Sequence, residues 1–471
     1  MITIGLDFGT HQTKVCIEER EGVERRYSFM KHKDADGKVK YTLPSIINID
    51  SDGKLSYGYV TPSADGQIVR YFKQGAFRTI PTMKMSQEDA LYYSCWYIAS
   101  VLFDLEDKYG QNFAVQMGVP TDGGHYEAAK QVAVRILASA YKLVEDVFHN
   151  DKKAFLNTNI AALKKLTTIE KYSIELKDEY AILVFPEAYA CLKPLTSKGK
   201  IPRATSLMID IGGGTTDISF FTIVQDEKRK NKEMVPVVYD FHSIDMGLNF
   251  LTNALQKEKG NSIQSTIDST KAKHKGIFHS FSELFAHHHD VAHQQPIDRI
   301  TSNVESELEI DSQRKEQFVH EIEKYVSNLI NRLRAEYKHQ TSLSIKLLED
   351  ALKNRPLIYC GGGSTFRLLQ KEYSCFTDKK MITYKDWDIK AVEDAKEIID
   401  LGLVPILSTS YGLAISVEDD NITQKPFRDI CEGLRKAEEE RKRKNHGSHQ
   451  LFSSHGKYDN YGSYDDYDTW K

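Results

Sequence analysis

The chain has 471 residues, which is enough for two or three domains. Hydrophobic residues make up 40% of it and charged residues 28%, and this balance excludes wholesale disorder and a fibrous repeat. A formal net charge of -4, from 63 basic and 67 acidic residues, argues against a dedicated nucleic-acid binder and a polybasic membrane anchor. We therefore expect a globular protein without nucleic-acid or membrane partners.

The first residues and the cysteines predict a cytoplasmic location. Residues 1–7 lack the basic region and cleavage site of a secretory signal. The most apolar run, 91–103, is shorter than a membrane span and predicts a buried helix. The six cysteines are scattered without a Cys-x-x-Cys pair, so the sequence indicates neither a zinc site nor a disulfide framework, and we expect reduced thiols.

Two segments share one pattern: an apolar strand, a tight turn rich in glycine and threonine, and a second strand. The first segment covers 2–19 and the second covers 207–224. Each carries an aspartate, Asp7 or Asp210, at the end of its first strand and shortly before a glycine. This internal repeat, about 200 residues apart, predicts two related lobes that face each other.

Strands and helices alternate between and after the two hairpins. The pattern predicts a strand over 113–119, a helix over 125–141, and a strand over 180–185 that runs into a helix start at Pro186 and Glu187. A polar helical subdomain follows over 255–341, and a strand over 356–360 leads into a third glycine cluster at 361–364. This alternation favours mixed α/β lobes.

The order of these elements predicts the domain organisation. Lobe I covers 1–200 and takes back 403–420, and lobe II covers 201–402 with the helical subdomain inside it. Residues 421–471 combine a charge run with regularly spaced tyrosines among glycine, serine and aspartate, which predicts a disordered tail.

The glycine-rich turns suit phosphate binding, because glycine lets the backbone approach an anion and consecutive N–H groups form a nest for its oxygens. Asp7 and Asp210 would repel a phosphate unless a hard divalent cation lay between them, and Mg²⁺ is the natural mediator. Lys14 offers a positive charge to β- and γ-phosphate oxygens. Four hydroxyls can bind phosphate or metal-bound water, those of Thr10, Thr13, Thr215 and Thr216.

Each of these features also has a purely structural interpretation. One Gly-Thr turn is more often only a turn, but two matched hairpins and a third glycine cluster favour a nucleotide site. Asp217 is either a second acidic group near the metal or a surface residue. Glu187 either orients an attacking water or only complements a helix dipole. The histidines from His287 to His293 fit a solvated helix better than a metal site.

The three glycine segments together resemble the actin-like ATPase superfamily of actins, sugar kinases and seventy-kilodalton heat-shock chaperones. The sequence Asp-Ile-Gly-Gly-Gly-Thr-Thr-Asp at 210–217 is similar to the second phosphate motif of that family. The sequence Gly-Gly-Gly-Ser-Thr-Phe-Arg at 361–367 is similar to its adenosine motif. Softer matches at 43–45, 57–58, 118–120 and 186–190 resemble the nucleotide-binding domain of the chaperones, and the resemblance spans about 2–417.

The resemblance implies an α/β fold with two ribonuclease-H-like lobes around a cleft for ATP or ADP with Mg²⁺. It implies that Asp7 and Asp210 hold hydrated Mg²⁺ and that Glu187 stands near the attacking water. Lys14 and Thr215 complete the expected catalytic set. The expected nucleotide contacts are Gly9, Thr10, His11, Gly212, Gly213, Gly214 and Thr215 at the phosphates, and Gly361, Gly362, Ser364 and Arg367 at the adenosine.

Two departures bear on the branch of the superfamily. The chaperones carry a catalytic lysine just after the segment that resembles 57–58, and residues 59–62 supply none. Lys14 follows the first aspartate by seven residues, as in actin and plasmid-segregation filament proteins, and is the candidate to compensate. Nothing after Val417 resembles the substrate domain and helical lid of the chaperones, for which the remaining residues are too few.

Three functions are compatible with this sequence. The main prediction is a slow Mg²⁺-dependent ATPase, a chaperone-like switch that acts through a protein partner such as a client, co-chaperone or effector. The alternative is an actin-like filament-forming ATPase of the cytoskeletal or segregation type, which self-assembles. A sugar kinase is less favoured, because no hexose-recognition constellation is visible in the sequence.

Overall fold

The computed structural model describes residues 1–34, 37–60, 66–77, 85–120, 126–196, 206–225, 234–244, 246–247, 312–336, 357–362, 381–383, 392–401 and 403–417. The chain divides into two compact units, 1–329 with 350–425 and 330–349 with 426–471. The described part of the second unit is the end of helix α13 (Ser312–Glu336). The sheets and the site described below belong to the first unit.

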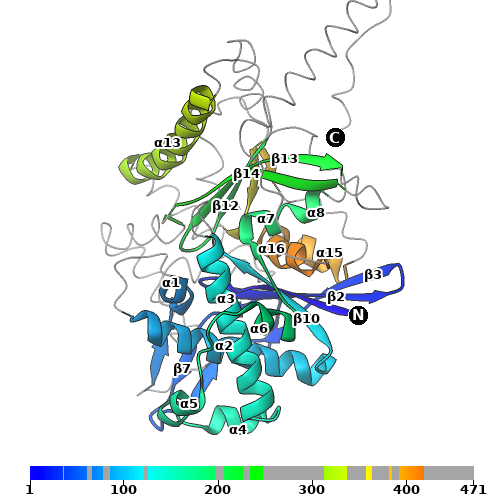
Figure 1. The fold of residues 1–471 in the computed structure, drawn as a ribbon, viewed down its shortest axis with the longest axis vertical. Helices are drawn as coiled ribbons and strands as arrows, with labels where there is room; N and C mark the ends of the chain where they lie inside the picture. The colour runs from blue at the N-terminus through cyan, green and yellow to red at the C-terminus, as the bar shows by residue number, and fades with distance from the viewer. Residues whose placement is uncertain are drawn as a thin grey trace, which may run out of the picture. The chain divides into compact units, whose positions relative to one another are not determined.

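The first sheet contains both strands of the first predicted hairpin (Figure 1). Its strand order is β11-β10-β1-β2-β3, and β6 (Leu43–Pro44) pairs with β2 outside this path. Strands β1, β2 and β3 are antiparallel, whereas β1, β10 and β11 run parallel. The bounds are β1 Ile2–Asp7, β2 Gln12–Glu21, β3 Glu24–Phe29, β10 Phe113–Val119 and β11 Ile182–Pro186.

The second sheet repeats this arrangement with the second hairpin. Its order is β14-β13-β12-β15-β16, with β12, β13 and β14 antiparallel and β12, β15 and β16 parallel. The bounds are β12 Ser206–Ile211, β13 Thr216–Gln225, β14 Met234–Ile244, β15 Leu357–Cys360 and β16 Met381–Thr383. The shared topology confirms the predicted fold class, a duplicated ribonuclease-H-like α/β fold.

The helices between residues 72 and 179 cover the first sheet and form most of the hydrophobic core beside it. Helix α2 (Gln87–Tyr109) contains the apolar run 91–103, almost all of it buried, which confirms the predicted buried helix. Ser86 caps its first turn by accepting a hydrogen bond from the N–H of Asp89. Helix α3 (Tyr126–Lys142) matches the helix predicted over 125–141 and continues as the π-helix η1 (Leu143–Val147).

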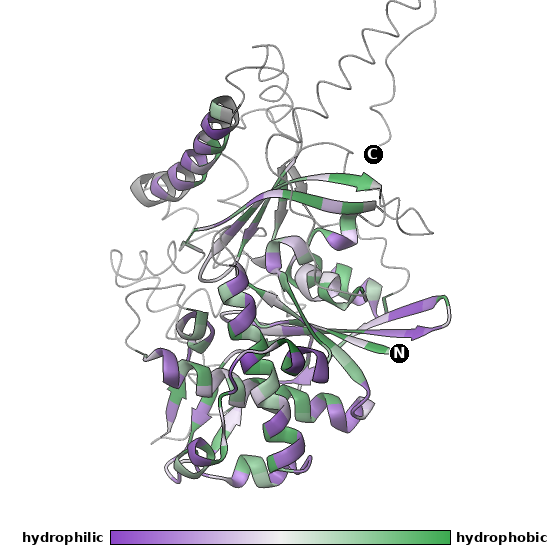
Figure 2. Cartoon of the chain, in the orientation of Figure 1, coloured by the Kyte–Doolittle hydropathy of each residue, from purple (hydrophilic) through white to green (hydrophobic). Residues whose placement is uncertain are grey.

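The remaining helices and strands between residues 32 and 179 are short. The helices are α1 Phe72–Phe77, α4 Lys152–Asn157, α5 Ile160–Leu166 and α6 Ile174–Glu179. The strands are β4 His32–Lys33, β5 Val39–Lys40, β7 Ile47–Ile49, β8 Leu55–Tyr57 and β9 Gln67–Val69. Figure 2 shows that the β2–β3 hairpin is hydrophobic in its inner part and hydrophilic at its tip.

In the described part of the chain, four further helices follow the strands of the first sheet in sequence: α7 Glu187–Ala190, α8 Lys193–Thr196, α15 Ala395–Asp400 and α16 Val404–Ala414. The backbone of α16 lies directly against β1 and α7. A Cβ atom added at Gly5 would lie 2.2 Å from the carbonyl oxygen of Ser410, and one added at Gly412 would lie 1.8 Å from that of Ala190. One hydrophobic cluster therefore contains residues from both sheets together with α7 and α16.

The predicted helical subdomain is described only through α13. Tyr325 of this helix is buried and donates a hydrogen bond of 2.8 Å to Asp240 on β14. Residues 255–311, which include the cluster from His287 to His293, lie outside the described residues, as do residues 337–341 and the tail 421–471. The lobe boundaries at 200 and 402 stay predictions. Among the described helices, none combines the length and the apolarity that a bilayer crossing requires.

Candidate functional site

The turns of the two repeated hairpins meet in the fold. A Cβ atom added at Gly213 would lie 2.0 Å from the ring of His11, and one added at Gly214 would lie 3.4 Å from the hydroxyl of Thr10. Only a residue without a side chain permits this approach. The glycines of the second turn therefore let its backbone contact the first turn, as the sequence predicts for lobes that face each other.

The third glycine cluster adjoins the second hairpin. Strand β15 pairs with β12 so that Cys360 lies opposite Asp210. Gly361 has a φ of 78°, and a Cβ atom added there would lie 2.2 Å from Oδ1 of Asp210. Gly362 faces open space, since an added Cβ atom would meet no atom within 4 Å. Ser364 and Arg367, the other residues expected at the adenosine, lie outside the described residues.

Four carboxylates gather around these turns. Asp7, Asp210 and Asp217 are buried, and Glu187 begins α7 after β11. Burial, together with the negative charges of Glu187 and Asp7, raises the pKa of Asp210 to about 7. Burial and the charge of Glu187 also raise the pKa of Asp217. The interpretation of Asp217 as a surface residue is therefore wrong.

Two lysines partly compensate this negative charge. Lys14 lies opposite Asp7 on the neighbouring strand, and its Nζ is 3.0 Å from Oδ2 of Asp7. Lys73 on α1 donates to Oε1 of Glu187 over 2.5 Å. Burial opposes a positive charge on Lys73, but the charges of Glu187 and Asp7 outweigh it and raise its pKa. Burial likewise raises the pKa of Glu187, although Lys73 acts in the opposite direction.

Sequence reasoning missed Lys73, because it looked for a lysine only within residues 59–62. The signal that could have found it is a lone charged residue in the otherwise uncharged helix Phe72–Phe77. The lysine is 5% exposed, and a lysine this deeply buried normally has a charged partner. A lysine therefore lies beside Glu187, and it comes from a helix further along the chain than residues 59–62.

The candidate threonines divide into two groups. The hydroxyl of Thr13 is fully buried and shares a 3.0 Å hydrogen bond with Ser45, and that of Thr216 donates to the carbonyl oxygen of Met246 over 2.7 Å. Both therefore have structural partners. Thr10 and Thr215 belong to the facing turns themselves. Ser45, from the segment 43–45, also donates to the carbonyl oxygen of Gly9 over 2.7 Å and so braces the first turn.

The donors and acceptors in this cluster fit a phosphate with a divalent cation. Four carboxylates face only two lysines, and carboxylate oxygens are preferred ligands of Mg²⁺. Oδ1 of Asp217 is buried and has no hydrogen-bond partner in the described residues. The same holds for Nε2 of Gln74, which lies beside Gly214 and can donate to an anion held by this turn. Unpaired buried polar atoms are rare unless a ligand uses them.

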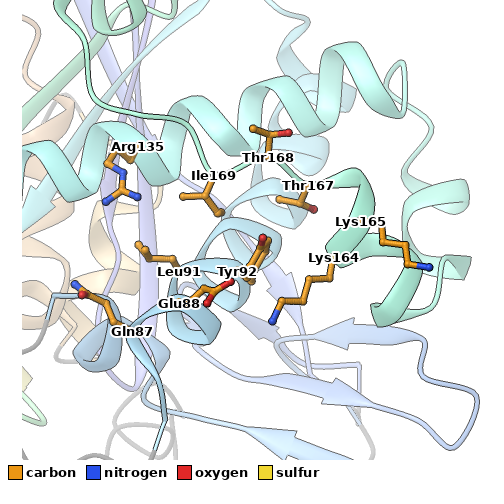
Figure 3. Close-up of a pocket in the computed structure, with 10 residues that line it drawn as sticks. All are labelled: Gln87, Glu88, Leu91, Tyr92, Arg135, Lys164, Lys165, Thr167, Thr168 and Ile169. Atoms are coloured by element: carbon orange, nitrogen blue, oxygen red, sulfur yellow. The ribbon is translucent and has the colours of Figure 1, made fainter.

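A separate open pocket of about 730 Å³ lies between α2, α3 and the end of α5 (Figure 3). It contains none of the predicted site residues. Two of its three basic residues have partners: Lys164 pairs with Asp89 at 3.0 Å, and Nε of Arg135 donates to the carbonyl oxygen of Glu170 over 2.9 Å. We therefore do not assign the nucleotide to this pocket.

Comparisons with known proteins identify similar solved structures. No family model matches the chain, and no curated protein matches its sequence. The archaeal actin homologue Ta0583, in complex with ADP, is 17% identical with a TM-score of 0.37, over 86% of this chain and 98% of that one.

Two further structures are similar to the chain at the same level. MreB5 of Spiroplasma citri, bound to AMPPNP, is 15% identical with a TM-score of 0.40, over 85% of this chain and 96% of that one. The MamK double helical filament is 14% identical with a TM-score of 0.40, over 83% and 96%. At these TM-scores, the fold assignment rests on the strand topology of the chain itself.

Proposed function

We propose that the chain binds ATP with Mg²⁺ between its two repeated hairpins and hydrolyses it to ADP. The observation that carries the proposal is the contact between the turns at His11 and Gly213, directly beside the buried carboxylates. A phosphate-binding nest next to acidic groups requires a cation. Each of the two repeats contributes a glycine-rich turn and an acidic group to this cluster.

Each residue has a proposed role. The backbone N–H groups of the two turns and Nε2 of Gln74 donate to phosphate oxygens. Asp7 and Asp210 hold hydrated Mg²⁺, which when bound neutralises charge on the phosphates. Lys14 adds a positive charge next to Asp7, at the side of the β- and γ-phosphates.

Glu187 is the proposed positioning group for water. Its carboxylate accepts a hydrogen bond from the water that attacks the γ-phosphorus, and the terminal oxygen of ADP leaves on the opposite side. Lys73 holds Glu187 in place through their 2.5 Å hydrogen bond. The raised pKa of Glu187 makes it a better proton acceptor than an exposed carboxylate.

Phosphate release from ATP tests this role. Glu187→Gln should slow turnover by about 10²–10⁴-fold while ATP still binds, which is the range for a group that assists proton transfer. The matched control is Glu106→Gln, a buried carboxylate on α2 whose pKa burial raises to about 7. The control should hydrolyse ATP like the wild type. Equal losses in the two variants would remove Glu187 from the mechanism.

For the biological output, we propose self-assembly into filaments ahead of a chaperone-like switch. The Lys14–Asp7 pair is the specific observation in its favour, because a lysine at this position is the feature that resembles actin-like filament proteins. The closeness to the chaperone branch stays a prediction, as do a client or co-chaperone and a cytoplasmic location. Sedimentation with ATP separates the two outputs: a filament shows a critical concentration, and a monomeric switch stays in the supernatant at all concentrations.

A further inference from the structure

Three sulfur atoms lie in contact beside Asp210. Sγ of Cys191, which follows α7, is 3.1 Å from Sδ of Met208 on β12 and 3.5 Å from Sγ of Cys360 on β15. Sγ of Cys360 is 3.4 Å from Sδ of Met208, so the three atoms form a closed triangle. All three side chains are fully buried. The three residues are widely spaced in the sequence, and the fold brings them together.

We propose that Cys191, Cys360 and Met208 form a binding site for one soft monovalent cation of the Cu(I) class. Two thiolates and a thioether are the ligands that select Cu(I) among the metals available to proteins. A thioether is not among the usual ligands of Zn²⁺, which are thiolate, imidazole and carboxylate. The site is separate from the proposed Mg²⁺ site, where the ligands are oxygen atoms.

The spacing of the three sulfur atoms suits a single cation. A metal–thiolate bond is about 2.3 Å long, and a cation at that distance from all three sulfurs would sit about 1.2 Å out of their plane. Oδ2 of Asp210 is 3.9 Å from Sγ of Cys191 and supplies a negative charge next to this position. The ligand atoms of Cys191, Asp210 and Cys360 all lie within 4.8 Å of one another.

The binding step is an exchange of protons for a metal ion, with no change of oxidation state. Cys191 and Cys360 are free and buried, so each thiol carries a proton that metal binding displaces. Cu(I) takes the place of these protons, which pass to the buffer. The burial of all three side chains also shields Cu(I) from solvent.

One consequence rests on the proposed function. A cation bound at the three sulfurs attracts the carboxylate of Asp210, which we also assign to Mg²⁺. Cu(I) should therefore weaken the binding of ATP with Mg²⁺ to the same chain. The site itself is tested without nucleotide, so that its failure is distinguishable from failure of the proposed function.

The test measures Cu(I) binding by the full chain in the absence of oxygen, in competition with a chromophoric Cu(I) chelator. Cys375 and Cys431 lie outside the described residues, so all variants carry Cys375→Ser and Cys431→Ser, and the unmodified chain is measured alongside. We expect one Cu(I) per chain. Cys191→Ser or Cys360→Ser should weaken binding more than about 100-fold, because even an outer-shell partner is worth about 10–100-fold.

Two variants keep the result interpretable. Met208→Leu preserves volume and should fold normally, yet it should weaken Cu(I) binding about 10-fold or more. Cys95→Ser removes a buried thiol from the other core cluster and should leave the affinity unchanged. The proposal is overturned if the reduced protein takes up no Cu(I), if Met208→Leu has no effect, or if Cys95→Ser weakens binding as much as Cys191→Ser.

Discussion

Replacing Asp210 by asparagine should make the protein more stable and at the same time abolish its proposed activity. The substitution keeps the volume of the side chain and replaces one of the four carboxylates of the cluster by a neutral amide. Without a cation, the negative charge of this carboxylate is unfavourable because Asp210 is 8% exposed and lies close to Glu187 and Asp7. With Mg²⁺ and ATP, the same charge is a proposed metal ligand.

The magnitude follows from the pKa of Asp210, which rises from 3.8 to about 7 on folding. The folded chain therefore binds more protons than the unfolded chain between these values, so stability falls as the pH rises from about 4 to 7. Above pH 7 the cost is complete and amounts to at most about 4 kcal/mol. At pH 5 it is about 1–2 kcal/mol, because Asp210 is then mostly protonated in the fold.

Thermal unfolding of the two proteins in EDTA, at pH 8 and pH 5, measures this difference. Asp210→Asn should unfold several degrees above the wild type at pH 8, and less than half of that gain should remain at pH 5. Asp240→Asn is the matched control, since Asp240 is buried in the same sheet but accepts a 2.8 Å hydrogen bond from Tyr325. It should show no gain at either pH. A wild-type unfolding temperature for Asp210→Asn at pH 8 would refute the proposed repulsion.

Three further predictions concern the surroundings of the site. Lys73→Met leaves Glu187 buried without its partner and should lower the free energy of unfolding in urea by about 3–5 kcal/mol. The double variant Lys73→Met with Glu187→Gln should recover most of this lost stability, and no recovery would contradict the ion pair. Gly412→Ala places a methyl group 1.8 Å from the carbonyl oxygen of Ala190 and should lower the unfolding temperature strongly, whereas Gly362→Ala, which meets open space, should not. Gly213→Ala places a methyl group 2.0 Å from the His11 ring, so the turns of the two hairpins must separate. The affinity for ATP, measured by calorimetry, should fall about 10-fold or more. An unchanged affinity would mean that the phosphates do not bind between these turns.

Local sequence patterns predicted much of this fold, because they depend on neighbouring residues. The apolar runs and glycine turns identified both hairpins, and the repeat at Asp7 and Asp210 predicted the shared topology of the two sheets. The helix over 125–141 and the strand over 113–119 were within a residue of the observed bounds. In these segments, the period of the hydrophobic residues decides the element.

Contacts between distant segments could not be predicted in this way. Lys73 reaches Glu187 across 114 residues, and Cys191 reaches Cys360 across 169 residues. No local sequence motif marks either pair, because tertiary packing brings the elements that carry these residues together. The burial of Asp217 has the same origin: its strand lies between β12 and β14, which the sequence around it does not reveal. The ion pair, the buried carboxylate and the sulfur cluster at the site could therefore be identified only from the fold.

Titration calorimetry of ATP, with Mg²⁺ and with EDTA, tests the central claim most directly. The wild-type chain should bind one ATP with Mg²⁺, and the affinity should fall at least about 10-fold in EDTA, because the buried carboxylates then repel the phosphates. Asp210→Asn should lose most of this dependence on Mg²⁺. An affinity that is the same with Mg²⁺ and with EDTA, or no binding of ATP by the folded wild-type chain, would contradict the account.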